Sequence, residues 1–142
     1  KLNLEYTHKI FYDSSSIGVQ VKTDLNIDEK NWAFGNKYET SIWYQELVNN
    51  NLAWSIRYKL AKEESIEGTD SRIFGPVQTA NPFNYGGINS YLGVGLNTTF
   101  RLFQSDHSDR LALELLMPTK QNKNNLQMED KNKIIIGYQK AF

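Results

Sequence analysis

The sequence predicts an all-β fold, an antiparallel transmembrane β-barrel of the bacterial outer-membrane type with about seven strands present. Three observations predict it. Apolar and polar residues alternate along seven segments, which is the period of a strand with two different faces. Aromatic residues make up 13% of a chain that is only 39% hydrophobic, so amphipathic rings are common in a polar sequence. The connections between the segments alternate between short and long, as periplasmic turns and external loops do in such barrels.

The first two strands are expected at Leu2–Tyr12 and Ile17–Ile27. In the second, Ile, Val, Leu and Thr alternate with Gly, Gln, Lys, Asp and Asn. The first shows the same alternation, which His8 interrupts on the apolar side. A short turn over residues 13–16 joins the two strands.

The third and fourth strands are expected at Tyr38–Leu47 and Leu52–Leu60. In the latter, Leu, Trp, Ile and Tyr alternate with Ala, Ser, Arg and Lys. Residues 28–37 form a longer connection before this pair, and residues 48–51 form the short turn within it.

The last three strands are expected at Leu92–Leu102, Arg110–Met117 and Lys133–Phe142. Long connections over residues 62–89 and 118–132 alternate with a short one over residues 104–109. Ten residues at about 3.3 Å each, tilted by about 45°, cover roughly 23 Å, which is close to the height of the apolar band of an outer-membrane barrel.

Charge and composition exclude several classes of protein. Sixteen basic residues balance sixteen acidic ones and the two signs are interleaved, so a nucleic-acid partner is not expected. The longest apolar runs, residues 115–117 and 134–136, are far too short for a spanning helix. With no cysteine and two histidines, we expect no disulfide, no metal site and no cofactor.

No catalytic residues are predicted, and we do not expect an enzyme. A hydrolase would need a nucleophile and a histidine within hydrogen-bond reach. Of the two histidines, His8 lies on an apolar strand side and His107 lies in a short polar turn.

The polar sides of the strands, taken as inward, are predicted to line the barrel lumen, where charges tune the passage of solutes. Arg57 and Arg110 are expected to form a network across the lumen with Glu39 and Glu114. The alternative is that inward charges pair between neighbouring strands and fill the barrel. The predicted lumen-lining residues are Lys22, Asp24, Glu39, Arg57, Lys59, Asn97, Arg101, Arg110 and Glu114.

The outward aromatic residues nearest the short turns are expected to form a girdle in the lipid headgroup layer. The last residue, Phe142, resembles the C-terminal signal that the barrel assembly machinery reads, although Lys140 departs from the usual apolar pattern and is expected to snorkel to the interface. The predicted membrane-interface aromatics are Tyr12, Tyr44, Trp54, Phe100 and Phe142.

The number of strands predicts that the barrel is larger than this chain. Seven strands that end in the periplasm begin outside the cell, whereas both termini of such barrels lie in the periplasm. An open sheet would also leave unpaired backbone groups in hydrocarbon. We therefore expect residues 1–142 to be one region, the C-terminal portion of a barrel whose N-terminal strands and signal peptide lie outside it, or a sheet that partner chains complete.

Residues 81–87, NPFNYGG, are the most structured part of the longest connection, because Pro fixes φ and the two Gly residues permit positive φ. We expect Phe83 and Tyr85 to form a loop constriction over the barrel mouth. The alternative is a turn-rich return to the next strand.

Spaced motifs from about Trp32 to the end of the chain occur in a characteristic order. They are FGNKYETSIW at 34–43, LAWSIRYKL at 52–60, NPFNYGG at 81–87, YLGVGLN at 91–97, DRLALELLMPT at 109–119 and IGYQKAF at 136–142. This order resembles the C-terminal half of the outer-membrane transporter-like family named for the meta-pathway of phenol degradation. The resemblance implies a barrel and suggests passage of small, hydrophobic or aromatic molecules.

We therefore expect a porin-like channel or transporter for small solutes in the outer membrane of Gram-negative bacteria, in contact with outer-membrane lipid. The alternatives are a non-conducting structural barrel, a homo-oligomer or subunit of a larger envelope assembly, and a soluble ligand-binding β-barrel. Detergent dependence separates the membrane forms from the soluble one, and conductance separates a channel from a plugged scaffold.

Overall fold

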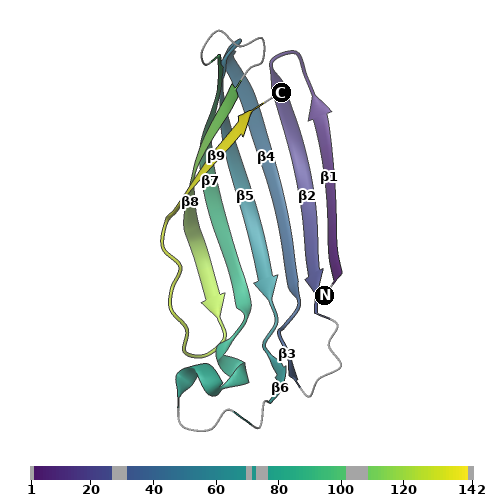
Figure 1. Cartoon of the computed structure of the whole chain (residues 1–142), viewed down its shortest axis with the longest axis vertical. Coiled ribbons are helices and arrows are strands. Elements are labelled where there is room, and N and C mark those ends of the chain that lie inside the picture. Colours follow the sequence, from purple (N-terminus) through teal and green to yellow (C-terminus); the bar gives the residue numbers. More distant parts are fainter. Residues whose placement is uncertain (1, 27–31, 70–71, 73–76, 102–108, 141–142) are drawn as a thin grey trace.

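Seven long strands form one antiparallel sheet that curls into a half-barrel (Figure 1). The computed structural model describes residues 2–26, 32–69, 72, 77–101 and 109–140. The strand order is β1-β2-β4-β5-β7-β8-β9, so each long strand pairs with the next long strand along the chain. Their bounds are β1 Leu2–Phe11, β2 Ser15–Leu25, β4 Lys37–Asn49, β5 Leu52–Glu63, β7 Gly87–Phe100, β8 Asp109–Lys123 and β9 Lys133–Lys140.

The all-β class and the seven predicted strands are confirmed, but four strands, β4, β5, β7 and β8, are longer than the sequence pattern indicates. β7 begins at Gly87 rather than Leu92, and β8 continues to Lys123 rather than ending at Met117. The extension passes through Pro118, which has no backbone N–H to donate. Ser90 pairs with Lys120 and Tyr91 pairs with Pro118, so Thr119 is an extra residue that forms a bulge in β8 directly after the proline, and bulges are where a sheet tolerates proline.

The pairing register collects the apolar side chains on one face of the sheet. Directly paired residues share a face, so a row can be followed from strand to strand. One row contains an apolar or aromatic residue from every long strand, namely Ile10, Ile17, Tyr44, Ile56, Val94, Leu115 and Ile134. The neighbouring row, on the other face, consists of Lys9, Gly18, Trp43, Arg57, Gly93, Leu116 and Lys133.

The polar face is the concave one. Small residues on this face leave space for large neighbouring side chains, so the sheet can curl towards it. Gly18, Gly93 and Gly95 are buried there. A Cβ atom at Gly18 would lie 2.2 Å from the Trp43 ring, and one at Gly93 would lie 2.6 Å from the Glu114 carboxylate. These glycines therefore make room for large side chains from the strands on either side.

The convex face leaves its apolar side chains exposed. Ile17 is 37% exposed, and Ile134 and Ile136 are each 70% exposed. Among the described residues, the buried hydrophobic ones are only Ala53, Tyr91 and Leu116, all on the concave side. Exposed apolar patches of this kind are rare in soluble monomers and mark surfaces that contact a partner protein or a membrane.

The connections at one end of the sheet contain small elements that the sequence pattern does not predict. β3 (Trp32–Ala33) pairs with β6 (Glu67–Gly68) in a two-stranded sheet. Two short 3₁₀ turns, η1 (Gln78–Ala80) and η2 (Pro82–Asn84), follow at the same end, which we call the loop end (Figure 1). In the described part of the chain, no helix has the length and apolar character needed to cross a membrane.

Replacing Gly18 with Val should lower the free energy of unfolding by about 1–3 kcal/mol, because the new side chain overlaps the Trp43 ring. The matched control is Gly137→Ala on the same face, whose Cβ would meet only the Ala112 Cβ at 3.7 Å. Denaturant unfolding followed by far-UV circular dichroism measures both. Equal stability of the two variants would contradict this account of the curl.

Candidate functional site

The concave face carries an ion pair at its centre. Arg57 Nε lies 3.0 Å from Glu114 Oε1. Arg57 belongs to β5 and Glu114 to β8, so the pair reaches over β7, where Gly93 leaves space for it. The Arg57 guanidinium also lies 5.4 Å from the centre of the Trp43 ring, and Lys9 Nζ lies 5.8 Å from that ring. Charge and aromatic surface are therefore combined on the face that was predicted to point inward.

The other predicted charges pair with neighbouring strands. Lys59 Nζ lies 2.8 Å from Glu39 Oε1, and Arg110 donates to Asn97 Oδ1 at 2.9 Å. Of the expected network, the structure thus brings Arg57 and Glu114 together, while Glu39 and Arg110 have different partners. Apart from the Arg57–Glu114 pair, these contacts join neighbouring strands, which is what the alternative interpretation expects of inward charges.

The remaining residues predicted to line a lumen lie on or near the same face. Lys22 is paired in register with Glu39, and Asp24 is paired in register with Lys37. Arg101 directly follows β7 and is exposed. A lumen needs a closed wall, so the lumen-lining role of the whole set stays a prediction.

Four of the five aromatic residues expected at the membrane interface lie at the short-turn end of the sheet. Tyr44 and Trp54 pack edge to face on the convex side, with ring centres 5.6 Å apart. Tyr12 follows β1 and is 59% exposed, and Phe100 ends β7. Phe142 lies outside the described residues. Whether these rings meet lipid headgroups stays a prediction.

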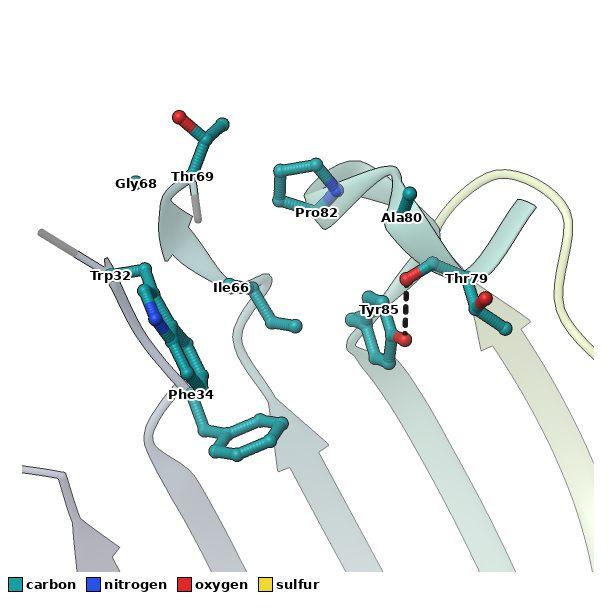
Figure 2. A pocket seen from close by; sticks show the side chains of 9 residues that line it. All are labelled: Trp32, Phe34, Ile66, Gly68, Thr69, Thr79, Ala80, Pro82 and Tyr85. Carbon is teal, nitrogen blue, oxygen red and sulfur yellow. Dashed lines mark hydrogen bonds between the residues drawn. The ribbon is translucent and has the colours of Figure 1, made fainter. Parts of the chain in front are cut away.

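The two residues expected to form a constriction lie at the loop end. Phe83 is exposed, and its carbonyl oxygen accepts a hydrogen bond from Asn125 Nδ2 at 2.9 Å. Tyr85 instead lines a cavity of about 150 Å³ between the connections (Figure 2). Its hydroxyl donates to the Thr79 carbonyl oxygen at 2.9 Å. The constriction therefore also stays a prediction.

A polar cluster around Asp130 was missed by the sequence interpretation. The Tyr91 hydroxyl donates to the Asp130 carboxylate, and Lys123 Nζ and Lys133 Nζ lie 3.3 and 3.7 Å from it. The Gln121 side chain donates to the Asp130 carbonyl oxygen at 3.0 Å and accepts from its N–H at 2.7 Å. These contacts hold the connection between β8 and β9 against the concave face.

The same cluster borders a polar cavity of about 270 Å³ on the concave face, together with Lys37, Glu39 and Glu63. Lys37 Nζ lies 3.0 Å from Glu63 Oε1. The hydrogen bond from Tyr91 holds the pKa of the Asp130 carboxyl below its usual value, and the nearby Lys123 and Lys133 act in the same direction. The Asp130 carboxylate therefore accepts a hydrogen bond from Tyr91 and forms ion pairs with Lys123 and Lys133.

The chain was compared with protein-family models, curated proteins and solved structures, and none of the three comparisons found a match. The family resemblance of the spaced motifs therefore stays a prediction.

Acidification should release the connection between β8 and β9. Because the pKa of Asp130 is lowered, its contribution to stability is fully present above the ordinary carboxyl pKa of about 3.9 and is lost as pH falls through the lower pKa of the folded protein. Hydrogen-exchange protection of residues 124–132, followed against pH, measures this release.

Asp130→Asn should remove most of that pH dependence and weaken protection at neutral pH, because the ion pairs to Lys123 and Lys133 are lost. Glu129→Gln, at an exposed neighbouring position, is the control and should behave as the unmodified chain. An undiminished acid transition in Asp130→Asn would contradict the assignment.

Proposed function

We propose that this sheet is part of the wall of a bacterial outer-membrane β-barrel channel for small solutes. The convex face contacts lipid, and the concave face contacts water and the passing solute. The observation that carries the proposal is the distribution of polarity over the two faces. The convex row has an apolar or aromatic residue from every long strand, and all of them except the half-buried Tyr44 are exposed, while ion pairs occupy the concave side.

Lipid contact explains why so many convex apolar side chains are exposed in the sheet. In a transmembrane barrel the apolar residues point outward and the polar residues inward, with period two along every strand. Burying the convex side in hydrocarbon removes the apolar surface from water, whereas the same surface in solution would promote aggregation.

A barrel wall also requires that both edges of the sheet be paired. Each inner strand bonds to two neighbours, but β1 and β9 have one paired side each within the described sheet. Unsatisfied backbone groups in hydrocarbon cost several kcal/mol each. We propose that further strands, of the same polypeptide or of partner chains, pair with β1 and β9, as in the larger barrel that the motif resemblance implies.

The concave face supplies the chemistry of an aqueous path. Arg57, Glu114, Lys59 and Glu39 present both signs of charge, and their mutual pairing leaves no excess charge of one sign on the wall of the path. With the short turns in the periplasm, the loop end faces outward, and Phe142 is the residue that the barrel assembly machinery would read. The proposed solutes are small and, following the resemblance, hydrophobic or aromatic.

A non-conducting structural barrel is the second candidate, and the pairing of charges between neighbouring strands favours it. Conductance of the folded protein in planar lipid bilayers separates the two. A channel gives discrete current steps, whereas a plugged barrel gives none. Absence of conductance under these conditions would contradict the channel proposal.

Arg110→Glu should shift the reversal potential in a salt gradient towards cation selectivity, because it replaces a positive by a negative charge on the concave face. Lys120→Glu makes the same charge change on the convex face, where Lys120 is paired in register with Ser90. This control should keep the original selectivity. An equal shift in both variants would indicate that the concave face does not line the conducting path.

A further inference from the structure

The half-open cavity at the loop end has the size and the lining of a small-molecule site (Figure 2). Its volume is about 150 Å³. It lies between the β3–β6 pair on one side and the η1–η2 turns on the other, and its main apolar surface comes from Trp32, Phe34, Ile66, Pro82 and Tyr85. Among the described lining residues none is charged.

We propose that this cavity binds one small, uncharged, apolar molecule about the size of a single six-membered carbon ring. The cavity volume indicates the size of the ligand, since an engineered cavity of about 150 Å³ with an aliphatic and aromatic lining stays dry and binds benzene. The uncharged lining indicates that the ligand is uncharged and apolar. A charged group would lose its hydration here without gaining a charged partner.

Two rings give the cavity a preferred shape. Trp32 and Phe34 pack edge to face, with centres 5.4 Å apart and planes at 81°. Both rings line the cavity, and aromatic rings make favourable edge-to-face or offset-stacked contacts with a third ring. The Tyr85 hydroxyl is already bonded to the Thr79 carbonyl oxygen, so it does not require a polar group from the ligand.

Hydrogen bonds between the connections hold the lining in place before a ligand arrives. Asn26 Nδ2 donates to the carbonyl oxygens of Phe34 and Gly35 at 3.0 and 2.9 Å. Ser65 Oγ donates to the Tyr85 carbonyl oxygen at 3.0 Å, and Asn124 Nδ2 donates to the same oxygen at 3.1 Å. A preformed site binds without the cost of ordering its loops.

The binding itself is independent of the proposed function, but its use in transport rests on it. At the mouth of a channel, the cavity would hold an apolar solute on its way to the polar concave face. Measurement of binding alone therefore tests the site whether or not the barrel conducts.

The direct test is a titration of the folded, lipid-embedded chain with benzene, followed by the NMR shift of the Ile66 methyl groups. Ile134 and Ile136, each 70% exposed on the convex face, report ligand that merely dissolves in the surrounding lipid. We expect a saturable shift at Ile66, a non-saturating change at Ile134 and Ile136, and no shift at Ile66 with benzoate, which has the same ring and a charge. No saturation at Ile66, or the same response to benzoate, would overturn the proposal.

Two substitutions assign the binding to this cavity, with the Ala80 methyl group as reporter. Ile66→Trp should abolish saturable binding by filling the space, and Phe34→Ala should weaken it about tenfold by removing a ring contact. Phe83→Ala is the matched control, since Phe83 is 66% exposed and does not line the cavity. Unchanged binding in Ile66→Trp, or equal weakening in Phe34→Ala and Phe83→Ala, would overturn the assignment.

Discussion

The strand register is the constraint on which the rest of the structure depends. With a side-chain period of two, one face of every strand is determined by its pairing, and a slip of a single residue would exchange the faces. The row from Ile10 to Ile134 shows that all six pairings keep the apolar residues together. The same register gathers Lys9, Trp43 and Arg57 on the opposite side. The separation of the apolar face from the polar face follows from this register, and so does the proposed membrane role.

The curl of the sheet follows from residue size as much as from polarity. Gly18 and Gly93 lie beneath large side chains that extend over them from neighbouring strands. This lets Arg57 on β5 reach Glu114 on β8, two strands away. The concave face can therefore carry long side chains and still curl, because Gly18 and Gly93 leave space beneath them.

The strands could be predicted from the sequence because their signal is local. Alternation within about ten residues identifies a strand and its two faces without knowledge of its partners. The sequence indicated a network of Arg57 and Arg110 with Glu39 and Glu114, but not which of them would pair. That Lys59 would be the partner of Glu39 depends on the register between β4 and β5.

The loop end could not be predicted in the same way, because its contacts join residues far apart in the chain. Tyr91 and Asp130 are 39 positions apart, and Asn125 and Phe83 are 42 apart. No periodic pattern marks such contacts. The continuation of β8 through Pro118 was missed for a related reason, because the bulge that accommodates it arises from pairing with β7.

The central claim is that the convex face contacts lipid and the concave face does not, and two natural tryptophans on opposite faces test it directly. Trp54 is paired in register with Leu96 on the convex side, and Trp43 is paired with Arg57 on the concave side. In bilayers of acyl-brominated lipid, a chain that retains only Trp54 should lose most of its fluorescence, while one that retains only Trp43 should keep it. Equal quenching of the two, or stronger quenching of Trp43, would contradict the account.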